Sequence, residues 1–265
     1  YLVSGQSFKI YLDKNRIIGK TFPFPKREEM HKFYQSMEYY PHSLNKKSLS
    51  AFLYETSRKL MHRKKLMWMK SNIKKNSKVL DYGCGTGEFV KFLRNNSINA
   101  YGYDPNIKFN EGDSRNYLTN KEKWKKQKYD IIVLWHVLEH IYNPSYLIKS
   151  LKINLQENGK IFIAIPNFKS YDSKYYGKYW AGYDVPRHLW HFTRKSIFKL
   201  AEENRYQIIR EGWLPLDTLY VSFLSEKHKK SKTPLFFGLI VGLLSILKSF
   251  FTKESSSLFL ILKKG

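Results

Sequence analysis

Three glycines at alternate positions interrupt the segment KVLDYGCGTGEFVKFL, residues 78–93. Residues 78–82 have the composition of a short buried strand, and residues 88–93 place apolar side chains at helical spacing. A strand that passes through a glycine turn straight into a helix is typical of α/β folds. Glycine adopts positive φ and lets the backbone approach a ligand closely. This turn therefore restricts both the fold and the place of a binding site.

The same order of strand, turn and helix recurs along the chain. We expect strands at 78–82, 99–104, 129–135 and 160–166, and helices at 143–159 and 193–204. The run YDIIVLW at 129–135 is nearly continuous in apolar residues, as expected for a strand covered on both faces. With a third strand near residue 113 and two more at 206–216 and 257–265, the pattern predicts a doubly wound, mostly parallel, seven-stranded sheet.

Additional segments flank this predicted core. Residues 8–22 alternate weakly around a polar turn, which predicts a β-hairpin, and a short helix follows from residue 26. A long helix is predicted at 48–73. We therefore expect an accessory N-terminal part at 1–47. The main domain is expected at 48–265, with an apolar helical insertion at 233–251.

Composition limits the classes of partner. Lys and Arg number 47 against 22 Asp and Glu, a net charge of +25, which attracts anionic partners. Only 10 of these cations are Arg, so a lysine-rich composition is the simpler interpretation, and recognition of a specific nucleic acid is not expected. The single cysteine, Cys84, excludes an internal disulfide, and we expect no metal. The first residues lack a basic start followed by an apolar run, so a cytoplasmic protein is expected.

Two acids stand where ligands of such sheets bind, beyond the carboxyl ends of the strands. Asp104 ends the second predicted strand, where its two oxygens suit both hydroxyls of a ribose, and Asp113 stands where the third strand would end, near an adenine amino group. The glycine spacing is G-x-G-x-G, which differs from the dinucleotide pattern G-x-G-x-x-G. The helix after the turn offers free N–H groups to an anionic part of the ligand.

The segments VLDYGCGTG, YGYDP and YDIIVLWHVLEHIYNP, in this order, resemble the successive motifs of class I S-adenosylmethionine-dependent methyltransferases. The resemblance spans residues 79–209. Within that superfamily the chain is most similar to the branch of ubiquinone-biosynthesis O-methyltransferases and bacterial sugar methyltransferases, whose segment after the fifth strand resembles YDVPRHLWHFTRKSIFKL. This implies an enzyme that transfers a methyl group from S-adenosyl-L-methionine to a small molecule or glycan, at oxygen.

The resemblance also implies roles for single residues. In the cofactor site, Gly83, Gly85 and Gly87 would line the methionine part, and Asp81 would accept from the ammonium group, directly or through water. Asp104 would bind the ribose and Asp113 the adenine amine, while Trp135 and His136 would supply backbone and a ring wall. Cys84 lies in the turn without a nearby base, which favours a structural role. Glu139 and His140 follow as residues that either take part in the site or only brace the next helix.

The segment after the fifth strand would contact the methyl acceptor. His188 is the first candidate for a base that takes the acceptor's proton, and His191 is the second. Arg187 would hold a carboxylate or phosphate of the acceptor. Tyr179, Trp180 and Tyr183 would line the binding site of an aromatic or sugar acceptor. Packed structural histidines, and aromatic residues that form a lid on the core, are the alternatives. Sugar-modifying relatives often carry a cysteine-rich N-terminal zinc module, and this chain has no cysteine there, which weakens a transfer of their substrates.

The segment 233–251, TPLFFGLIVGLLSILKSFF, fits the core fold poorly because it is apolar except for Lys248 and a few small residues. Basic residues precede it, which suits peripheral contact with an acidic membrane or a cover over a lipophilic acceptor. A buried helix or a homodimer contact is the alternative. A different class of function also remains open at this point, namely a non-catalytic protein that uses the cofactor fold and its charge to bind nucleic acid or membrane.

Overall fold

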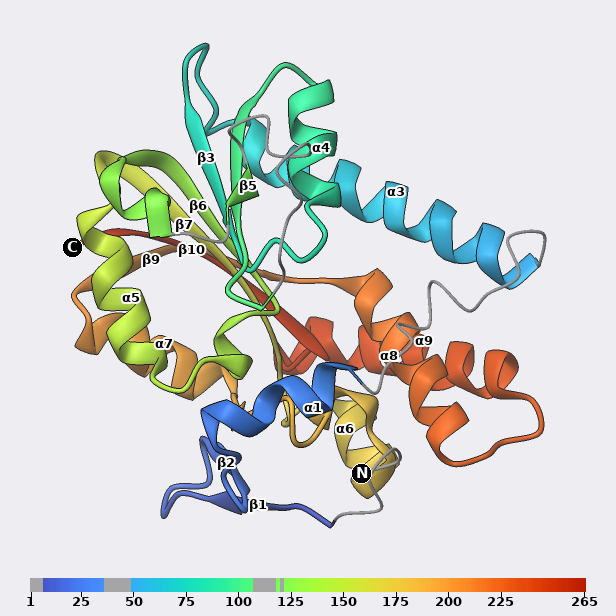
Figure 1. Ribbon diagram of the computed structural model, residues 1–265. Helices are drawn as coiled ribbons and strands as arrows, with labels where there is room; N and C mark the ends of the chain where they lie inside the picture. The colour runs from blue at the N-terminus through green and yellow to red at the C-terminus, as the bar shows by residue number, and fades with distance from the viewer. Residues whose placement is uncertain (1–6, 36–48, 107–117, 120–121) are drawn as a thin grey trace. The chain divides into compact units, whose positions relative to one another are not determined.

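The computed structural model describes residues 7–35, 49–106, 118–119 and 122–265, and its larger sheet has seven strands (Figure 1). The strand order is β5-β4-β3-β6-β7-β10-β9. Strand β3 is parallel to β4 and β6, β4 is parallel to β5, and β9 and β10 are antiparallel. The predicted doubly wound, mostly parallel sheet is confirmed. Its strands are β3 Lys78–Tyr82, β4 Asn99–Tyr103, β5 Leu118–Thr119, β6 Tyr129–Trp135, β7 Leu155–Pro166, β9 Tyr206–Trp213 and β10 Ser257–Lys264.

The described residues form two compact units. One contains 26–133 and 153–160, with helices α1 Met30–Gln35, α3 Leu49–Lys70 and α4 Glu88–Asn95. Helix α4 buries Phe89, Val90 and Leu93, spaced so that they share the face that packs on β4. In the interior strands of this unit, the apolar side chains of Val79, Leu80, Ile131 and Ile132 are fully buried. The buried core thereby fixes the carboxyl ends of β3 and β4, where the glycine turn and Asp104 lie.

The helix in this region is shorter than the predicted 143–159. Helix α5 covers Pro144–Ile153, and β7 already starts at Leu155. Asn154 explains this end. Its side-chain amide donates to the carbonyl oxygens of Trp124, Lys125 and Gln127 at 3.3, 2.9 and 2.8 Å, and its own carbonyl accepts from the N–H of Tyr129. These long-range bonds outweigh the local helical pattern at 155–159.

The other unit contains the chain up to residue 25, residues 134–152 and residues 161–265. The predicted hairpin is confirmed as β1 Lys9–Leu12 and β2 Gly19–Phe22, and β2 also pairs with β8 Trp190–His191 in a three-stranded sheet. Helix α7 Arg194–Glu203 begins after Thr193, which caps it because its Oγ1 accepts from the N–H of Ser196. The division at residue 47 stays a prediction, since residues 36–48 lie outside the described part of the chain.

A helical pair lies between the last two strands in sequence: α8 Pro215–His228 and α9 Pro234–Thr252 pack side by side (Figure 1). The predicted apolar insertion is therefore one helix. Its small residues Gly238, Gly242, Ser245 and Ser249 are buried, and a side chain at Gly238 would meet the backbone of Phe223 at 2.7 Å. Short helices complete this unit: α6 Tyr171–Tyr176, with single turns at Leu138–His140, Gly177–Tyr179 and Ala181–Tyr183.

Candidate functional site

The glycine turn after β3 has the conformation that its sequence requires. Gly83, Gly85 and Gly87 have φ of 78°, 55° and 79°, a region that residues with a side chain rarely adopt. The N–H groups of Gly83 and Cys84 both donate to the carbonyl of Tyr103, at 2.7 and 3.1 Å. A side chain at Gly85 would meet no described atom within 4 Å, so the turn faces open space at this residue. The turn therefore exposes backbone to a ligand while it is anchored to β4.

Asp104 connects the turn to the end of β4. Its Oδ2 accepts from the N–H of Gly85 at 3.0 Å, and its Oδ1 accepts from the N–H of Asn106 at 2.8 Å. The residue is 9% exposed. A carboxylate oxygen has a second lone pair after one hydrogen bond, so both oxygens can still accept from ligand hydroxyls. Asp104 thus has a structural role in the turn in addition to the predicted role in binding ribose.

Asp81 is the buried acid of this turn. Burial raises the pKa of Asp81 to about 7, which outweighs the lowering by Lys65, and the nearby charge of Asp104 raises the pKa further. A buried carboxylate of this kind is stabilised by a cationic ligand group. The ammonium group of S-adenosylmethionine supplies such a charge, and the open side of Gly85 supplies room. The turn, Asp81 and Asp104 therefore fit the predicted cofactor.

Three further residues were predicted at the cofactor. Asp113 lies outside the described residues. Trp135 is buried, and its ring stacks on Phe259 at 5.8 Å, in the core of its own unit. His136 has a φ of 56°, and its Nε2 lies 2.8 Å from Oδ2 of Asp217 on α8. No observation tests their roles at the cofactor, which stay predictions.

Cys84 is a poor nucleophile. Burial raises the pKa of its thiol well above the ordinary value, and the charges of Asp81 and Asp104 raise it further. The thiol is therefore protonated at neutral pH, as the structural interpretation predicts.

A cluster of titratable side chains lies in the other unit, around the turn that follows β6. Glu139 is 1% exposed and its Oε1 lies 3.5 Å from Nδ1 of His136 and 3.9 Å from Nε2 of His188. The rings of His140 and His188 meet edge to face at 4.6 Å. The N–H of Leu189 donates to the carbonyl of Glu139 at 2.8 Å, which fixes the two segments to each other.

The charges of this cluster differ from one histidine to the next. Burial lowers the pKa of His136, but the nearby carboxylates of Asp217 and Glu139 raise it more, to about 9, so His136 carries a positive charge at pH 7. Burial is the main reason why the pKa of His188 lies well below its ordinary value, and the charges of His140 and His191 lower it further. His188 is therefore a neutral imidazole at pH 7.

His191, the second candidate base, has a different environment. Its Nε2 lies 2.9 Å from Oγ1 of Thr21, and its ring packs against Tyr183. Burial lowers the pKa of His191 to about 3. The contact with Thr21 connects β8 to the N-terminal hairpin, which favours a structural role, and its part in catalysis stays a prediction.

Most of the residues predicted to contact the acceptor form their contacts within the protein instead. Arg187 forms an ion pair with Asp184, and Nε1 of the buried Trp180 donates to Oδ2 of Asp172 at 2.7 Å. Tyr183 packs on Trp180, in a cluster that also includes Val241 of α9. Tyr179 is 40% exposed, with the ammonium group of Lys178 over its ring. This packing favours the alternative of a lid on the core for Trp180 and Tyr183.

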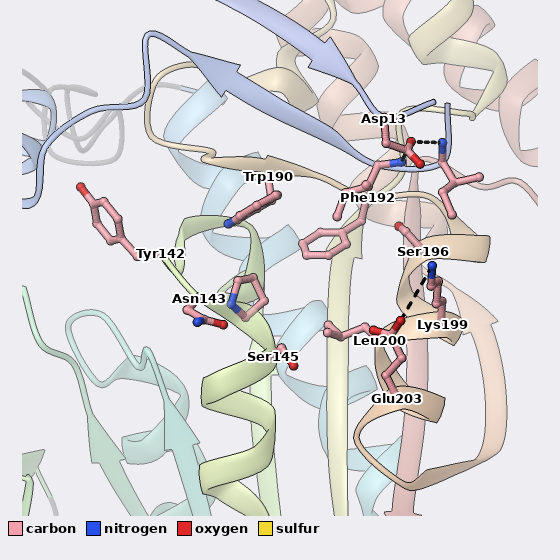
Figure 2. Close-up of a pocket in the computed structure, with 13 residues that line it drawn as sticks. Asp13, Tyr142, Asn143, Ser145, Trp190, Phe192, Ser196, Lys199, Leu200 and Glu203 are labelled. Carbon is pink, nitrogen blue, oxygen red and sulfur yellow. Dashed lines mark hydrogen bonds and ion pairs between the residues drawn. The ribbon is translucent and has the colours of Figure 1, made fainter. Parts of the chain in front are cut away.

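A separate pocket of about 430 Å³ lies between the hairpin and α7 (Figure 2). Ile17, Trp190, Phe192 and Leu200 give it an apolar lining, and Asp13 lies at its rim. Oδ1 of Asp13 accepts from the N–H groups of Ile17 and Ile18 at 2.7 and 3.0 Å, which holds the hairpin turn. None of the described residues predicted for the cofactor or the acceptor lines this pocket.

Comparison with known proteins defines the class. The sheet and its flanking helices are those of the Rossmann-like methyltransferase fold. The magnesium protoporphyrin IX methyltransferase of Synechocystis PCC 6803 with bound SAH has this fold with a TM-score of 0.53, at 13% identity over 90% of this chain and 98% of that one. The [4+2]-cyclase SpnF is similar with a TM-score of 0.50, at 12% identity over 77% and 80% of the two chains. The fold alone therefore does not decide the reaction.

The match of the sequence to a known family identifies the class of reaction. Residues 52–211 match the profile of a family described as "Methyltransferase domain", and the chain belongs to this family. It is 25% identical over 179 residues to the ubiquinone biosynthesis O-methyltransferase of Pelagibacter ubique. This alignment covers 57% of this chain and 75% of the relative. The protein is an S-adenosylmethionine-dependent methyltransferase, as the glycine turn and the resemblance predicted. The non-catalytic alternative is not supported.

The sequence left the role of Glu139 and His140 open between a part in the site and a brace for the next helix. The sequence signal was present as LEH at 138–140, shortly after the strand at 129–135, but a helix brace explained it equally well. Their significance comes from His188, 48 positions further on in the chain, which only the fold brings to them.

The raised pKa of Asp81 leads to a prediction for cofactor binding. Only the ionised carboxylate attracts the ammonium group of S-adenosylmethionine, so affinity should rise as pH increases through about 7. Titration of a group of that pKa gives a roughly tenfold rise between about pH 6 and 7.5, where the cofactor's own amino group remains largely protonated. Calorimetric titration across this range measures it. Asp81→Asn should bind more weakly at pH 7.5 and show a flat profile, whereas a sloping profile in Asp81→Asn would assign the titration to another group.

Proposed function

We propose that this methyltransferase transfers the methyl group to an oxygen of a small-molecule or glycan acceptor. The observation that carries the proposal is the neutral His188 in a buried cluster with a carboxylate. Nδ1 of His188 lies 3.0 Å from the carbonyl oxygen of Gly182. A carbonyl only accepts, so Nδ1 carries the proton and Nε2 has a free lone pair. The similarity to the Pelagibacter O-methyltransferase supports the same chemistry.

The reaction explains why a buried, unprotonated nitrogen is useful. The cofactor supplies the reactive methyl group, which moves by in-line displacement, and the protein aligns the acceptor and removes its proton. A hydroxyl is a weak nucleophile until that proton leaves, so an oxygen acceptor needs a base or another means of lowering its pKa. An amine acceptor that is already unprotonated needs neither.

A screen with labelled cofactor tests the proposal. Cell extract, separated into small-molecule and glycan fractions, is incubated with the protein and methyl-labelled S-adenosylmethionine. We expect one labelled product, and magnetic resonance of its methyl group should show an O-methyl shift. A methyl group on nitrogen or carbon, or no product although the cofactor binds, would contradict the proposal. Protein without cofactor affinity would contradict the methyltransferase assignment itself.

We also propose that helix α9 contacts an acidic membrane surface, which would place this enzyme at the membrane. Among the described residues, α9 is the one helix whose length and composition would allow it to cross a bilayer. Its large apolar side chains are exposed and, at 100° per residue, cover an arc of ~200° of the helix. They are Leu235, Phe236, Phe237, Leu239, Ile240, Leu243, Leu244, Leu247, Phe250 and Phe251. A second protein surface covers a narrower stripe, whereas acyl chains adapt to a wide one.

Charge and packing support a helix that lies in the membrane interface. Residues 227–253 contain six Lys and no Asp or Glu, which suits anionic lipid headgroups. The opposite face of α9 is held in the protein, because Gly242 fits closely against Leu219 and Oγ of Ser245 donates to Oδ1 of Asp172 at 2.8 Å. A helix that is fixed along one face lies on the bilayer and does not span it.

Leu243→Asp should weaken binding to vesicles of phosphatidylcholine and phosphatidylglycerol at least about tenfold, since burial of a Leu side chain contributes roughly 1.5–3 kcal/mol. Co-sedimentation measures the bound fraction. Ile153→Asp is the matched control, because Ile153 is 75% exposed on α5. Binding should also fall at high salt and on pure phosphatidylcholine. The proposal would be contradicted if the parent protein did not bind vesicles and instead formed a dimer that Leu243→Asp disrupts. The exposed face of α9 would then contact a second copy of the chain.

A further inference from the structure

We propose that Glu139, His140 and His188 bind one divalent transition-metal cation of the zinc type. The sequence predicted no metal because the chain lacks cysteine ligands, but histidine and carboxylate ligands need no cysteine. Ligand atoms of these three residues all lie within 4.8 Å of one another. The inference deepens the proposed function and rests on it for the acceptor's part, whereas the cation site itself can be tested without any acceptor.

Glu139 provides the first argument. Its side chain is almost fully buried, and neither carboxylate oxygen accepts a hydrogen bond from any described residue. A buried carboxylate without hydrogen bonds is costly, and native structures keep one only where a partner is supplied. Oε1 of Glu139 is directed at the histidines, 3.9 Å from Nε2 of His188. A cation between these atoms would satisfy both.

The orientation of the two histidines provides the second argument. Nδ1 of His140 lies 3.0 Å from the carbonyl oxygen of Arg187, and Nδ1 of His188 lies 3.0 Å from that of Gly182. Both Nδ1 atoms therefore carry the proton, which leaves Nε2 as the ligand atom. A hydrogen bond from the other ring nitrogen to a backbone carbonyl is the usual support of a metal-binding histidine. Two such histidines beside one buried carboxylate make a site whose ligands are already oriented.

The geometry requires only small adjustments. Ligand atoms around a tetrahedral zinc ion lie about 3.3 Å apart, given a zinc–nitrogen distance of roughly 2.0–2.1 Å. The bond from Leu189 to the carbonyl of Glu139 fixes the backbones of the two segments, so side-chain rotation can bring the ligand atoms together. Two imidazoles and one carboxylate select zinc and its transition-metal neighbours, because magnesium and calcium prefer shells of oxygen.

The neighbouring charges define the alternative. His136 carries a positive charge that compensates part of the charge of Glu139, and Asp217 pairs with His136 on its far side. Asp184, which pairs with Arg187, has its Oδ2 3.7 Å from Nε2 of His188. A network of protons among these groups, without a metal, is the competing account of the cluster.

A cation held by three protein ligands keeps a coordination position for another oxygen. In this site the acceptor's hydroxyl would occupy it, and coordination would lower the pKa of that hydroxyl. Nε2 of His188 has one lone pair, so His188 serves either as the base or as a ligand. A cation would therefore restrict the acceptor to molecules that offer an oxygen to the metal.

Zinc binding to the untagged full-length chain tests the site. The protein is stripped with a chelator, dialysed, and titrated with Zn²⁺, with metal content measured by plasma mass spectrometry. We expect one equivalent per chain. Glu139→Gln and His188→Gln should each lower affinity at least about 100-fold, since even the outer partners of metal ligands typically contribute 10–100-fold. His62→Gln, a histidine of α3 that packs on Phe89 and Phe92, is the control and should bind like the parent.

The outcomes separate the site from the enzyme function. A parent chain that binds no stoichiometric zinc, or variants that bind as tightly as the parent, would overturn the site and support the proton network. Glu139→Gln should keep its circular dichroism spectrum, so that lost binding is not lost fold. Methyl transfer at the full rate by stripped protein would remove the cation from the reaction while the proposed function stands. If the protein binds zinc but yields no O-methylated product, the metal site stands and the proposed function is contradicted.

Discussion

Asp104→Ala is expected to lower affinity for S-adenosylmethionine about 100-fold or more. Two ribose hydroxyls would lose a charged acceptor, and each such hydrogen bond contributes roughly 1.5–3 kcal/mol. A total of ~3 kcal/mol corresponds to about two orders of magnitude in the dissociation constant. The structure adds a second cause, because the N–H groups of Gly85 and Asn106 also lose their acceptor. Calorimetric titration with the cofactor and with its demethylated product measures the change.

Asp130→Ala is a matched control for that variant. Oδ2 of Asp130 also accepts a backbone N–H, from Lys78 at 2.8 Å, at the start of β3 and away from the turn. Its removal should leave cofactor affinity unchanged. Asp104→Asn keeps one oxygen and should fall between parent and Asp104→Ala. A dissociation constant that Asp104→Ala leaves unchanged would mean that the ribose is bound elsewhere.

The sheet was predictable from the sequence because its signals are local. The run 129–135 became β6 without a change of bounds, and the glycines at 83, 85 and 87 all take the positive φ that their spacing predicted. The helix at 143–159 was overestimated because the amide of Asn154 binds three carbonyls of a segment about thirty positions earlier. Periodicity contains no information about such a bond.

The acceptor side was less predictable for the same reason. Trp180 and Arg187 have residue types suited to a substrate pocket, but their polar groups pair with Asp172 and Asp184. A sequence shows that a side chain can bind a ligand and does not show that the protein already occupies it. Conversely, Glu139 gained its significance from a lack of hydrogen bonds among the described residues, which only coordinates reveal.

The cofactor side and the acceptor side also differ in what the protein must provide. At the turn, glycine backbone and two acids would bind a molecule that brings its own reactive group. Under the proposals above, Glu139, His140 and His188 would activate the acceptor. A fold shared with a [4+2]-cyclase does not specify the reaction, whereas the proposed cluster after β6 would restrict it.

His188→Ala is expected to lower kcat by about 10²–10⁴-fold and to leave cofactor affinity nearly unchanged. Loss of a general base typically costs that much, and loss of a cation ligand would remove activation of the same hydroxyl. The side chain is buried and bonded to Gly182, so thermal unfolding should be measured alongside the rate. Single-turnover methyl transfer to the acceptor found in the screen measures the effect on the chemical step.

Two controls, a second histidine variant and chemical rescue, show what this variant means. His191→Ala removes the contact with Thr21 and should lower the melting temperature more than the rate per folded molecule. If instead His191→Ala loses the rate and His188→Ala keeps it, the roles of the two histidines are exchanged. Added imidazole should restore His188→Ala without metal if His188 acts as a base, whereas restoration that requires Zn²⁺ would identify it as a ligand. If both variants keep the parent rate, alignment alone carries the transfer, and the acceptor is a carbon or an oxygen that is already ionised.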